Sequence, residues 1–223
     1  MNLQKMFEMQ KVLDERIIKE KGLEGQDLLP NLILALQVEL AECANEWRGF
    51  KHWSNDREPR TKIEHFCPTC EGTGDENHDI NLQYLEEGHA AEPYSKCQDC
   101  NGSGKIGESN PLLEEYVDCL HFILSIGNRI GYSNKNTKKL EGGTLRSNLD
   151  VADQVGVFSD VFEAIAMVNE DISLSRLGPK AGYAILFRRF NSLGKMLGFT
   201  PDQIEAAYMD KNAVNHQRQQ EGY

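Results

Sequence analysis

Apolar side chains recur every three to four residues in six segments of this chain, the spacing that places them on one face of a helix. The segments span approximately residues 2–21, 27–48, 111–130, 151–174, 179–197 and 200–220. Outside residues 55–107, no run alternates apolar and polar side chains as a half-buried β-strand does. We therefore expect an all-α fold, built as a helical bundle.

Several boundaries of these helices carry residues that favour them. Asp27 is expected to cap the second helix, with Pro30 in its first turn, and Thr200 is expected to cap the last helix. Apolar residues nearly encircle residues 27–48, which predicts a buried helix. The polar, glycine-rich residues 132–149 predict a loop.

Two near-duplicate cysteine motifs stand in the segment that lacks the helical pattern. They are CPTCEGTG, which begins at Cys67, and CQDCNGSG, which begins at Cys97. Each C-x-x-C offers two thiolates, and the glycine after it permits the tight turn of a zinc knuckle. The expected ligands are Cys67, Cys70, Cys97 and Cys100. Four thiolates close a tetrahedral site, so the motifs predict a structural Zn²⁺ rather than two disulfides.

The cysteine segment divides the chain into three parts. We expect a helical domain formed by residues 1–54 and 109–223, interrupted by a zinc-binding insert at residues 55–108. The histidines of the insert are expected to be exposed loop residues, because the thiolates already fill the metal site; they are His65, His78 and His89.

The net charge restricts the partners of the chain. Lys and Arg number 24 against 35 Asp and Glu, a formal charge of −11 over 223 residues. A chain this acidic is repelled by nucleic-acid backbones, so direct nucleic-acid binding is not expected. The first 20 residues lack the apolar core of a signal peptide, and no apolar run is long enough to cross a membrane. These features favour a soluble, cytoplasmic protein.

Two of the expected helices carry acidic pairs at the same spacing. Glu39 and Glu42 lie in the second helix, and Glu115 and Asp118 lie in the helix after the insert. Residues three apart share a helix face, so packing of the two helices would bring four carboxylates together. Such a group needs compensating cations, and Mg²⁺ prefers hard oxygen ligands. Acidic residues at this spacing are also common on solvated faces, so the pattern alone leaves that alternative open.

The last helix presents two cations and an amide on one face, at Lys211, Asn215 and Arg218. Cations in this arrangement could balance the charge of a triphosphate. A basic surface patch at a C-terminal helix is the alternative, because cations there also favour the helix dipole.

Four segments of the chain resemble the dimeric dUTPases, which belong with the MazG-like proteins among the all-α nucleoside triphosphate pyrophosphatases. The segments are MQKVLDERI from Met9, ALQVELAECANEWRGFKHWS from Ala35, LLEEYVDCLHFILSIG from Leu112 and AAYMDKNAVNHQRQQEGY from Ala206. The paired carboxylates are common to the whole superfamily, whereas FKHWS and the terminal motif point to the dUTPases. The insert is absent from that pattern, and its motifs resemble the repeats of the DnaJ cysteine-rich domain.

The resemblance implies an Mg²⁺-dependent enzyme that converts dUTP, and in some relatives dUDP, to dUMP and keeps uracil out of DNA. It implies that Mg²⁺ is held by Glu39, Glu42, Glu115 and Asp118. Glu39 would also take the proton of the attacking water. The resemblance further implies a homodimer, with residues 151–197 as the candidate interface.

Three groups of residues are implied to contact the substrate. The sugar would contact Asp118, Asn215 and Phe122. The uracil pocket would be lined by Gln10, Asp14 and Trp53, although some family members have Asn at the position of Asp14. The phosphate chain would be held by Lys51, Lys211, Arg218 and Tyr223.

Two other functions remain open at this point. One is a MazG-like pyrophosphatase that acts on another nucleotide such as dCTP, in which case the base-side residues would differ in role. The other is a zinc-ribbon adaptor on a non-catalytic helical scaffold.

Overall fold

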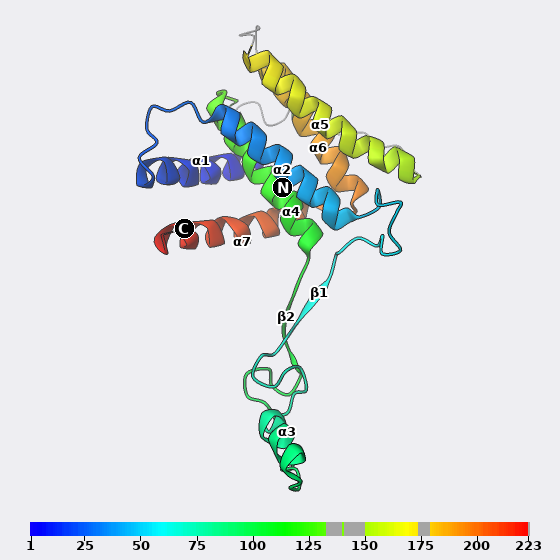
Figure 1. Ribbon diagram of the computed structural model, residues 1–223. Coiled ribbons are helices and arrows are strands. Elements are labelled where there is room, and N and C mark those ends of the chain that lie inside the picture. Colours follow the sequence, from blue (N-terminus) through cyan, green and yellow to red (C-terminus); the bar gives the residue numbers. More distant parts are fainter. Residues whose placement is uncertain (133–139, 141–149, 174–178, 223) are drawn as a thin grey trace. The chain divides into compact units, whose positions relative to one another are not determined.

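The computed structural model describes residues 1–132, 140, 150–173 and 179–222 of the chain (Figure 1). The helices are α1 (Leu3–Glu20), α2 (Leu29–Trp47), α3 (His78–Glu87), α4 (Pro111–Arg129), α5 (Val151–Ser173), α6 (Pro179–Met196) and α7 (Pro201–Gln220). The strands are β1 (Ile63–Phe66) and β2 (Lys105–Ser109). The predicted all-α fold with a small cysteine-containing insert is confirmed.

The described residues form two compact units. One comprises Met1–Pro59 and Leu112–Tyr223, and the other comprises Arg60–Pro111. The first unit contains six of the helices, with α5 beside α6 and α1 beside α7. The second contains both strands and α3. Apart from residues 132 and 140, the predicted loop at residues 132–149 lies outside the described residues.

The helix caps follow the sequence at the start of α7 and differ from it at the start of α2. Thr200 and Gln203 form a reciprocal capping box at the start of α7. The cap of α2 is Leu28 rather than Asp27, so that prediction was wrong by one residue. Asp27 still accepts a hydrogen bond from the backbone N–H of Leu29, at 3.1 Å, and so satisfies one of the free donors of the first turn.

Buried tyrosines of two helices tie α4 to α6. The ring of Tyr116 stacks on Phe190 with centroids 4.2 Å apart, and its hydroxyl donates to the carbonyl of Phe190 at 3.2 Å. Tyr183 donates to the carbonyl of Ile123 at 2.9 Å. Each hydroxyl is therefore paired inside the core, which allows a large ring to be buried without an unpaired polar atom.

The second helix is less buried than its sequence suggests. Leu36 and Leu40 are fully buried in the helical core, whereas the side chains of Leu34 and Val38 are 62% and 48% exposed. The prediction of a helix buried on all sides is therefore wrong for the single chain, where one apolar stripe of α2 faces outward.

The second unit is organised by a short antiparallel ladder. Ile63 of β1 pairs with Ser109 of β2, and Phe66 pairs with Lys105 after a register irregularity. The ladder brings the two ends of the segment together, so that the cysteine motifs lie in the loop between the strands. Within the described residues, no helix has the length and apolar character needed to span a membrane.

Gly127 of α4 gives a test of the packing between α4 and α6. A Cβ at this position would lie 2.8 Å from Cε1 of Phe7 and would also clash with the hydroxyl of Tyr183. We predict that Gly127→Ala lowers the free energy of unfolding by about 1–3 kcal/mol, despite the better helix propensity of alanine. Gly156→Ala in α5 is the matched control, because nothing lies within 4 Å of its Cβ position. The control should be stabilising by about 0.4–1 kcal/mol in the same denaturant titration. Equal effects of the two variants would contradict the packing.

Candidate active site and candidate metal centre

Carboxylates from two helices gather at one place in the helical unit. One carboxylate oxygen from each of Glu39, Glu42 and Glu115 lies within 4.8 Å of the others. Asp118 is one turn further along α4, and its Oδ2 accepts a hydrogen bond from Nζ of Lys211 at 2.6 Å. The i, i+3 spacing places each acidic pair on one face of its helix, as the periodicity predicts, and Lys211 of α7 adds a cation at the edge of the group.

The surroundings oppose ionisation of these carboxyl groups. Burial, and then the neighbouring Asp118 carboxylate, raises the pKa of Glu39 to about 7. The same two causes raise the pKa of Glu115 to about 7. Burial also raises the pKa of Asp118, although Lys211 acts in the opposite direction. Lys211 and Arg218 both lower the pKa of Asp118, but they do not offset its burial, so the cluster is short of positive charge.

The donor set fits a divalent cation with a preference for hard ligands. Carboxylate oxygens are the ligands that Mg²⁺ takes in proteins, and a bound cation would favour the ionised form of each group. Glu39 and Glu115 are half-buried and Glu42 is exposed, so the site is open to solvent and to phosphate oxygens on one side.

A cavity of about 380 Å³ adjoins the carboxylates and is lined by α1, α4 and α7 together with parts of α2. Most of the residues expected from the sequence to contact a nucleotide line it. They are Gln10, Asp14, Asp118, Phe122, Lys211, Asn215 and Arg218, together with Glu39. Segments from opposite ends of the chain thus contribute to one cavity with an acidic edge, a basic wall and an aromatic ring.

Lys51 and Trp53 do not line this cavity. Arg48 ends α2 in the left-handed conformation, with φ 63°, and the chain then turns away from the helix axis. The Trp53 side chain is 68% exposed and makes edge contacts with Phe50 and His52. Nζ of Lys51 lies 5.7 Å from the centre of the Phe50 ring. Their expected contacts with the substrate stay predictions, and Tyr223 lies outside the described residues.

A buried hydrogen-bond network forms the inner end of the cavity. Nε2 of Gln10 donates to Oδ1 of Asp14 at 2.9 Å and to Oγ of Ser125 at 3.0 Å. Ser125 in turn donates to the same Oδ1 at 2.9 Å. Oε1 of Gln10 is 2.6 Å from Nδ1 of His121 and 3.1 Å from the hydroxyl of Tyr208.

Three members of this network were missed in the sequence: Ser125, His121 and Tyr208. His121 and Ser125 lie three and seven residues after Asp118, so the helical spacing of α4 contains the signal that could have found them. Burial lowers the pKa of His121 to about 3, so its imidazole is neutral. Burial raises the pKa of Asp14 to about 6, against the opposing hydrogen bonds from Gln10 and Ser125.

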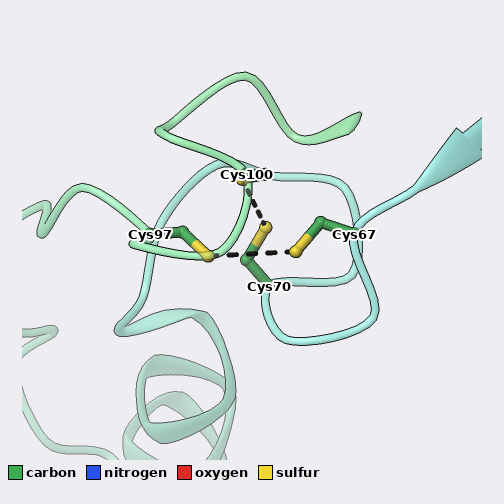
Figure 2. Close-up of side chains that lie close together, drawn as sticks. All are labelled: Cys67, Cys70, Cys97 and Cys100. Atoms are coloured by element: carbon green, nitrogen blue, oxygen red, sulfur yellow. Dashed lines mark hydrogen bonds between the residues drawn. The ribbon is translucent and has the colours of Figure 1, made fainter. Parts of the chain in front are cut away.

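The four cysteines of the insert converge on one point (Figure 2). The Sγ atoms of Cys67 and Cys97 are 3.9 Å apart, and those of Cys70 and Cys100 are 3.6 Å apart. These separations are far longer than a disulfide bond of about 2.05 Å, so the thiols are unpaired. All four are buried, in a unit that has no other buried apolar cluster among the described residues.

The backbone of each motif folds around its sulfur atoms in the same way. The N–H of Gly74 donates to Sγ of Cys70 at 3.2 Å, and the N–H of Gly104 donates to Sγ of Cys100 at 3.3 Å. Both glycines have positive φ, 78° and 73°. A Cβ on Gly74 would also lie 2.9 Å from the carbonyl carbon of Gly102 in the other motif. The two knuckles therefore pack closely, in a geometry that could hold a tetrahedral metal ion.

The histidines of the insert lie apart from the four sulfur atoms. His65 is in β1, exposed, and its Nε2 is 3.0 Å from Oγ of Ser109. His78 begins α3, is half-buried and lies 3.6 Å from a carboxylate oxygen of Glu71. His89 is exposed beside Glu87. The expectation of exposed loop residues is therefore right for His89 alone, because pairing places His65 in the ladder and His78 at a helix start.

The carboxylate cluster predicts an unusual pH dependence of stability. Between the ordinary glutamate pKa of 4.5 and about 7, the folded chain binds more protons at Glu39 and Glu115 than the unfolded chain does. Stability contributed by these groups is therefore lost as the pH rises through this window. His121 acts in the opposite direction below its ordinary pKa of 6.5. Burial raises the pKa of Cys100 in the cysteine unit, but hydrogen bonds, led by the one from the N–H of Gly104, lower it to about 7, so this thiol acts in the opposite direction above pH 7. A variant of the cluster itself is therefore needed to identify its contribution.

We predict that the unfolding midpoint in EDTA falls between pH 6.5 and pH 8.0, and that millimolar Mg²⁺ restores it at pH 8.0. Glu115→Gln should flatten the fall, because it removes one of the raised carboxyl groups. Glu114→Gln, at an exposed neighbouring position of α4, is the control. A pH profile in EDTA that is the same in Glu115→Gln as in the wild-type protein would contradict the electrostatics of the cluster.

Comparison with known proteins assigns the family of the chain. Residues 2–66 and 103–223 match the family described as dUTPase, while the unmatched residues 67–102 contain the four clustered cysteines. A search of curated proteins finds no match. The family match covers more than half of the chain and includes every residue of the carboxylate cluster and its cavity. The chain belongs to the dUTPase family, the all-α family of dUTP diphosphatases.

Proposed function

We propose that the protein is an Mg²⁺-dependent dUTP diphosphatase that hydrolyses dUTP to dUMP and pyrophosphate and so keeps uracil out of DNA. The observation that carries the proposal is that the carboxylate cluster borders, through Glu39 and Asp118, a cavity that is also lined by Lys211, Arg218 and Phe122. Each part has a counterpart in the substrate, namely metal-bound phosphates, free phosphate oxygens and the sugar.

The metal would be held by the four carboxylates, Glu39, Glu42, Glu115 and Asp118. When bound there, Mg²⁺ lowers the pKa of water and neutralises charge on the phosphates. The convergence of Glu39, Glu42 and Glu115, whose carboxylate oxygens lie within 4.8 Å of one another, supports this assignment.

Glu39 would take the proton from the attacking water. An ionised carboxylate can accept a proton from a neighbouring water, and a bound cation would keep Glu39 ionised. It also lines the cavity, where the phosphate chain would have to lie. Glu115 does not line the cavity, which favours Glu39 for this role.

Lys211 and Arg218 would bind the phosphate chain. Nζ of Lys211 donates to Oδ2 of Asp118 at 2.6 Å, at the edge of the cavity, where the ammonium group would also be available to a phosphate oxygen. Arg218 lies two turns further along α7, on the same helix face.

Asp118 and Asn215 would receive the 3′-hydroxyl of the sugar, with Phe122 against the deoxyribose. Phe122 is one turn beyond Asp118 on α4, and all three residues line the cavity. An aromatic face at this position leaves no polar partner for a 2′-hydroxyl, which disfavours ribonucleotides.

Homodimer formation is proposed for the chain, with α5 and α6 as the interface. The outward apolar stripe of α2, at Leu34 and Val38, supports association because it is exposed in the single chain. An apolar groove of about 330 Å³ between α2 and α5, lined by residues that include Trp47 and Phe158, also supports association. Association would also offer Lys51 and Trp53 a cavity that they do not reach within their own chain.

The four cysteines are proposed to bind one structural Zn²⁺. Four thiolates would fill the tetrahedral coordination of the Zn²⁺ and leave no open position, so we expect the metal to have no role in the hydrolysis. The metal would take the place of a hydrophobic core in this small unit, in which α3 has no buried residue.

A nucleotide panel tests the proposed hydrolysis directly. With Mg²⁺, chromatography should show that dUTP is converted to dUMP and pyrophosphate, whereas UTP is spared. Glu39→Gln should lower kcat on the order of 10²- to 10⁴-fold, because it removes the proposed base and a metal ligand. Glu114→Gln should leave the rate unchanged. Absence of dUTP hydrolysis by the folded, metal-loaded protein would refute the proposal.

Elemental analysis tests the cysteine centre. The purified protein should contain about one zinc per chain, and the Cys67→Ser/Cys97→Ser variant should contain none. The variant should retain dUTP hydrolysis if its helical unit remains folded by circular dichroism. Zinc that persists in the double variant, or hydrolysis lost from a folded one, would contradict a purely structural zinc site.

A further inference from the structure

The C-terminal half of α7 carries part of the site but has no buried residue. The buried residues of this helix are Ile204, Tyr208 and Asn212, so the buried stretch ends at Asn212. Residues 213–220 are exposed or half-buried, and two of the side chains that line the cavity, Asn215 and Arg218, belong to this half. A helix end without buried side chains opens readily, because little is lost when it frays. The site therefore depends on contacts that hold this half of α7 in place.

Arg16 of α1 makes such a contact. Its Nη1 donates to the carbonyl oxygen of His216 at 3.0 Å and lies 3.3 Å from Nδ1 of the same residue. The contact joins α1 to α7, which lie side by side in the helical unit (Figure 1). A carbonyl oxygen has two lone pairs, so it can accept from Arg16 in addition to its bond within the helix. A cation near the C-terminus of a helix also interacts favourably with the helix dipole.

Glu20 fixes the direction of the Arg16 side chain. Nε of Arg16 donates to Oε1 of Glu20 at 2.7 Å, across one turn of α1. The guanidinium group is planar and its donors have fixed angles, so a bond at Nε determines where Nη1 points. The side chain is only 26% exposed, which limits competition from water.

The carbonyl that Arg16 contacts lies between the two cavity-lining residues of this half. His216 follows Asn215 directly and precedes Arg218 by two residues. Fixing the backbone at His216 therefore fixes the part of the helix from which both side chains extend. Arg16 itself does not line the cavity, so any effect that it has on a substrate there passes through α7.

We propose that Arg16 is a positioning residue that holds the C-terminal half of α7 at the cavity and so places Arg218 for the phosphate chain of the substrate. The second part of the inference rests on the proposed function, which assigns Arg218 to the phosphates. The first part, the attachment of α7 to α1, does not depend on any substrate.

Backbone amide hydrogen exchange, measured by mass spectrometry without substrate, tests the attachment. Arg16→Gln should speed exchange in residues 213–222 by at least about threefold, whereas residues 204–212, which contain the buried side chains, should be unaffected. Lys19→Gln is the control, because it removes an exposed cation from the same helix. It should exchange as the wild-type protein does. Equal exchange of residues 213–222 in Arg16→Gln and the wild-type protein would overturn the inference.

A double-mutant cycle with Arg218 tests the positioning. Arg16→Gln should lower kcat/KM for dUTP by about three- to tenfold, the effect of one hydrogen bond at a partly exposed site. In an Arg218→Gln background the same change should have an effect of less than about twofold, because the side chain that Arg16 positions is gone. Lys19→Gln should leave kcat/KM unchanged. Equal factors in the two backgrounds would show that Arg16 does not act through Arg218, and would overturn the positioning role.

The two measurements separate a failure of the inference from a failure of the proposed function. If the wild-type protein does not hydrolyse dUTP, the proposed function fails, and hydrogen exchange still decides whether Arg16 holds α7. If the wild-type protein hydrolyses dUTP and Arg16→Gln changes neither exchange nor kcat/KM, the inference is overturned and the proposed function stands.

Discussion

Carboxylates of α2 and α4 converge in a partly buried seam, and the rest of the site depends on this convergence. Burial, and then the neighbouring like charges, oppose ionisation and raise the pKa of Glu39 and of Glu115 to about 7. The helical core holds them there, since α2 and α4 are fixed by buried residues such as Leu40 and Tyr116. The stability of the fold thus maintains an arrangement that is unfavourable until a cation binds.

The helical architecture could be predicted from the sequence because periodicity is a local signal. The three-residue spacing of Glu39 with Glu42, and of Glu115 with Asp118, was enough to predict that each pair shares one helix face. The family resemblance indicated that the two helices bring these pairs to one site. The cysteine motifs could be predicted to form zinc knuckles for a similar reason, because each knuckle is formed by residues close together in the sequence. Such features require only short stretches of chain.

Features that depend on the meeting of distant segments could not be predicted in this way. Helical spacing places His121 and Ser125 near the face of Asp118, but their hydrogen bonds to Gln10 join residues more than 100 positions apart, and no local pattern predicts that pairing. The surroundings of Trp53 depend on the turn that Arg48 begins in the left-handed conformation. The apolar residues Leu34 and Val38 were predicted to lie in the core but are exposed. Apolar character alone does not show whether a side chain is buried by its own chain or by another.

The insert is compatible with the family fold because its ends meet in the β1–β2 ladder. The family match stops at residue 66 and resumes at residue 103, close to the paired residues Phe66 and Lys105. A segment whose entry and exit lie side by side can be added to a connection without separating the helices on either side. The four cysteines then stabilise a unit that lacks an apolar core of its own.

The most direct test of the account is calorimetric titration of Mn²⁺ into the protein in the presence of a dUTP analogue with an imido bridge between the α and β phosphates. The account predicts that Mn²⁺ binds, and that Glu39→Gln and Glu115→Gln each weaken this binding at least about tenfold, because each removes an anionic ligand. Mn²⁺ affinity that is the same in both variants as in the wild-type protein would contradict the assignment of the carboxylate seam as the metal site.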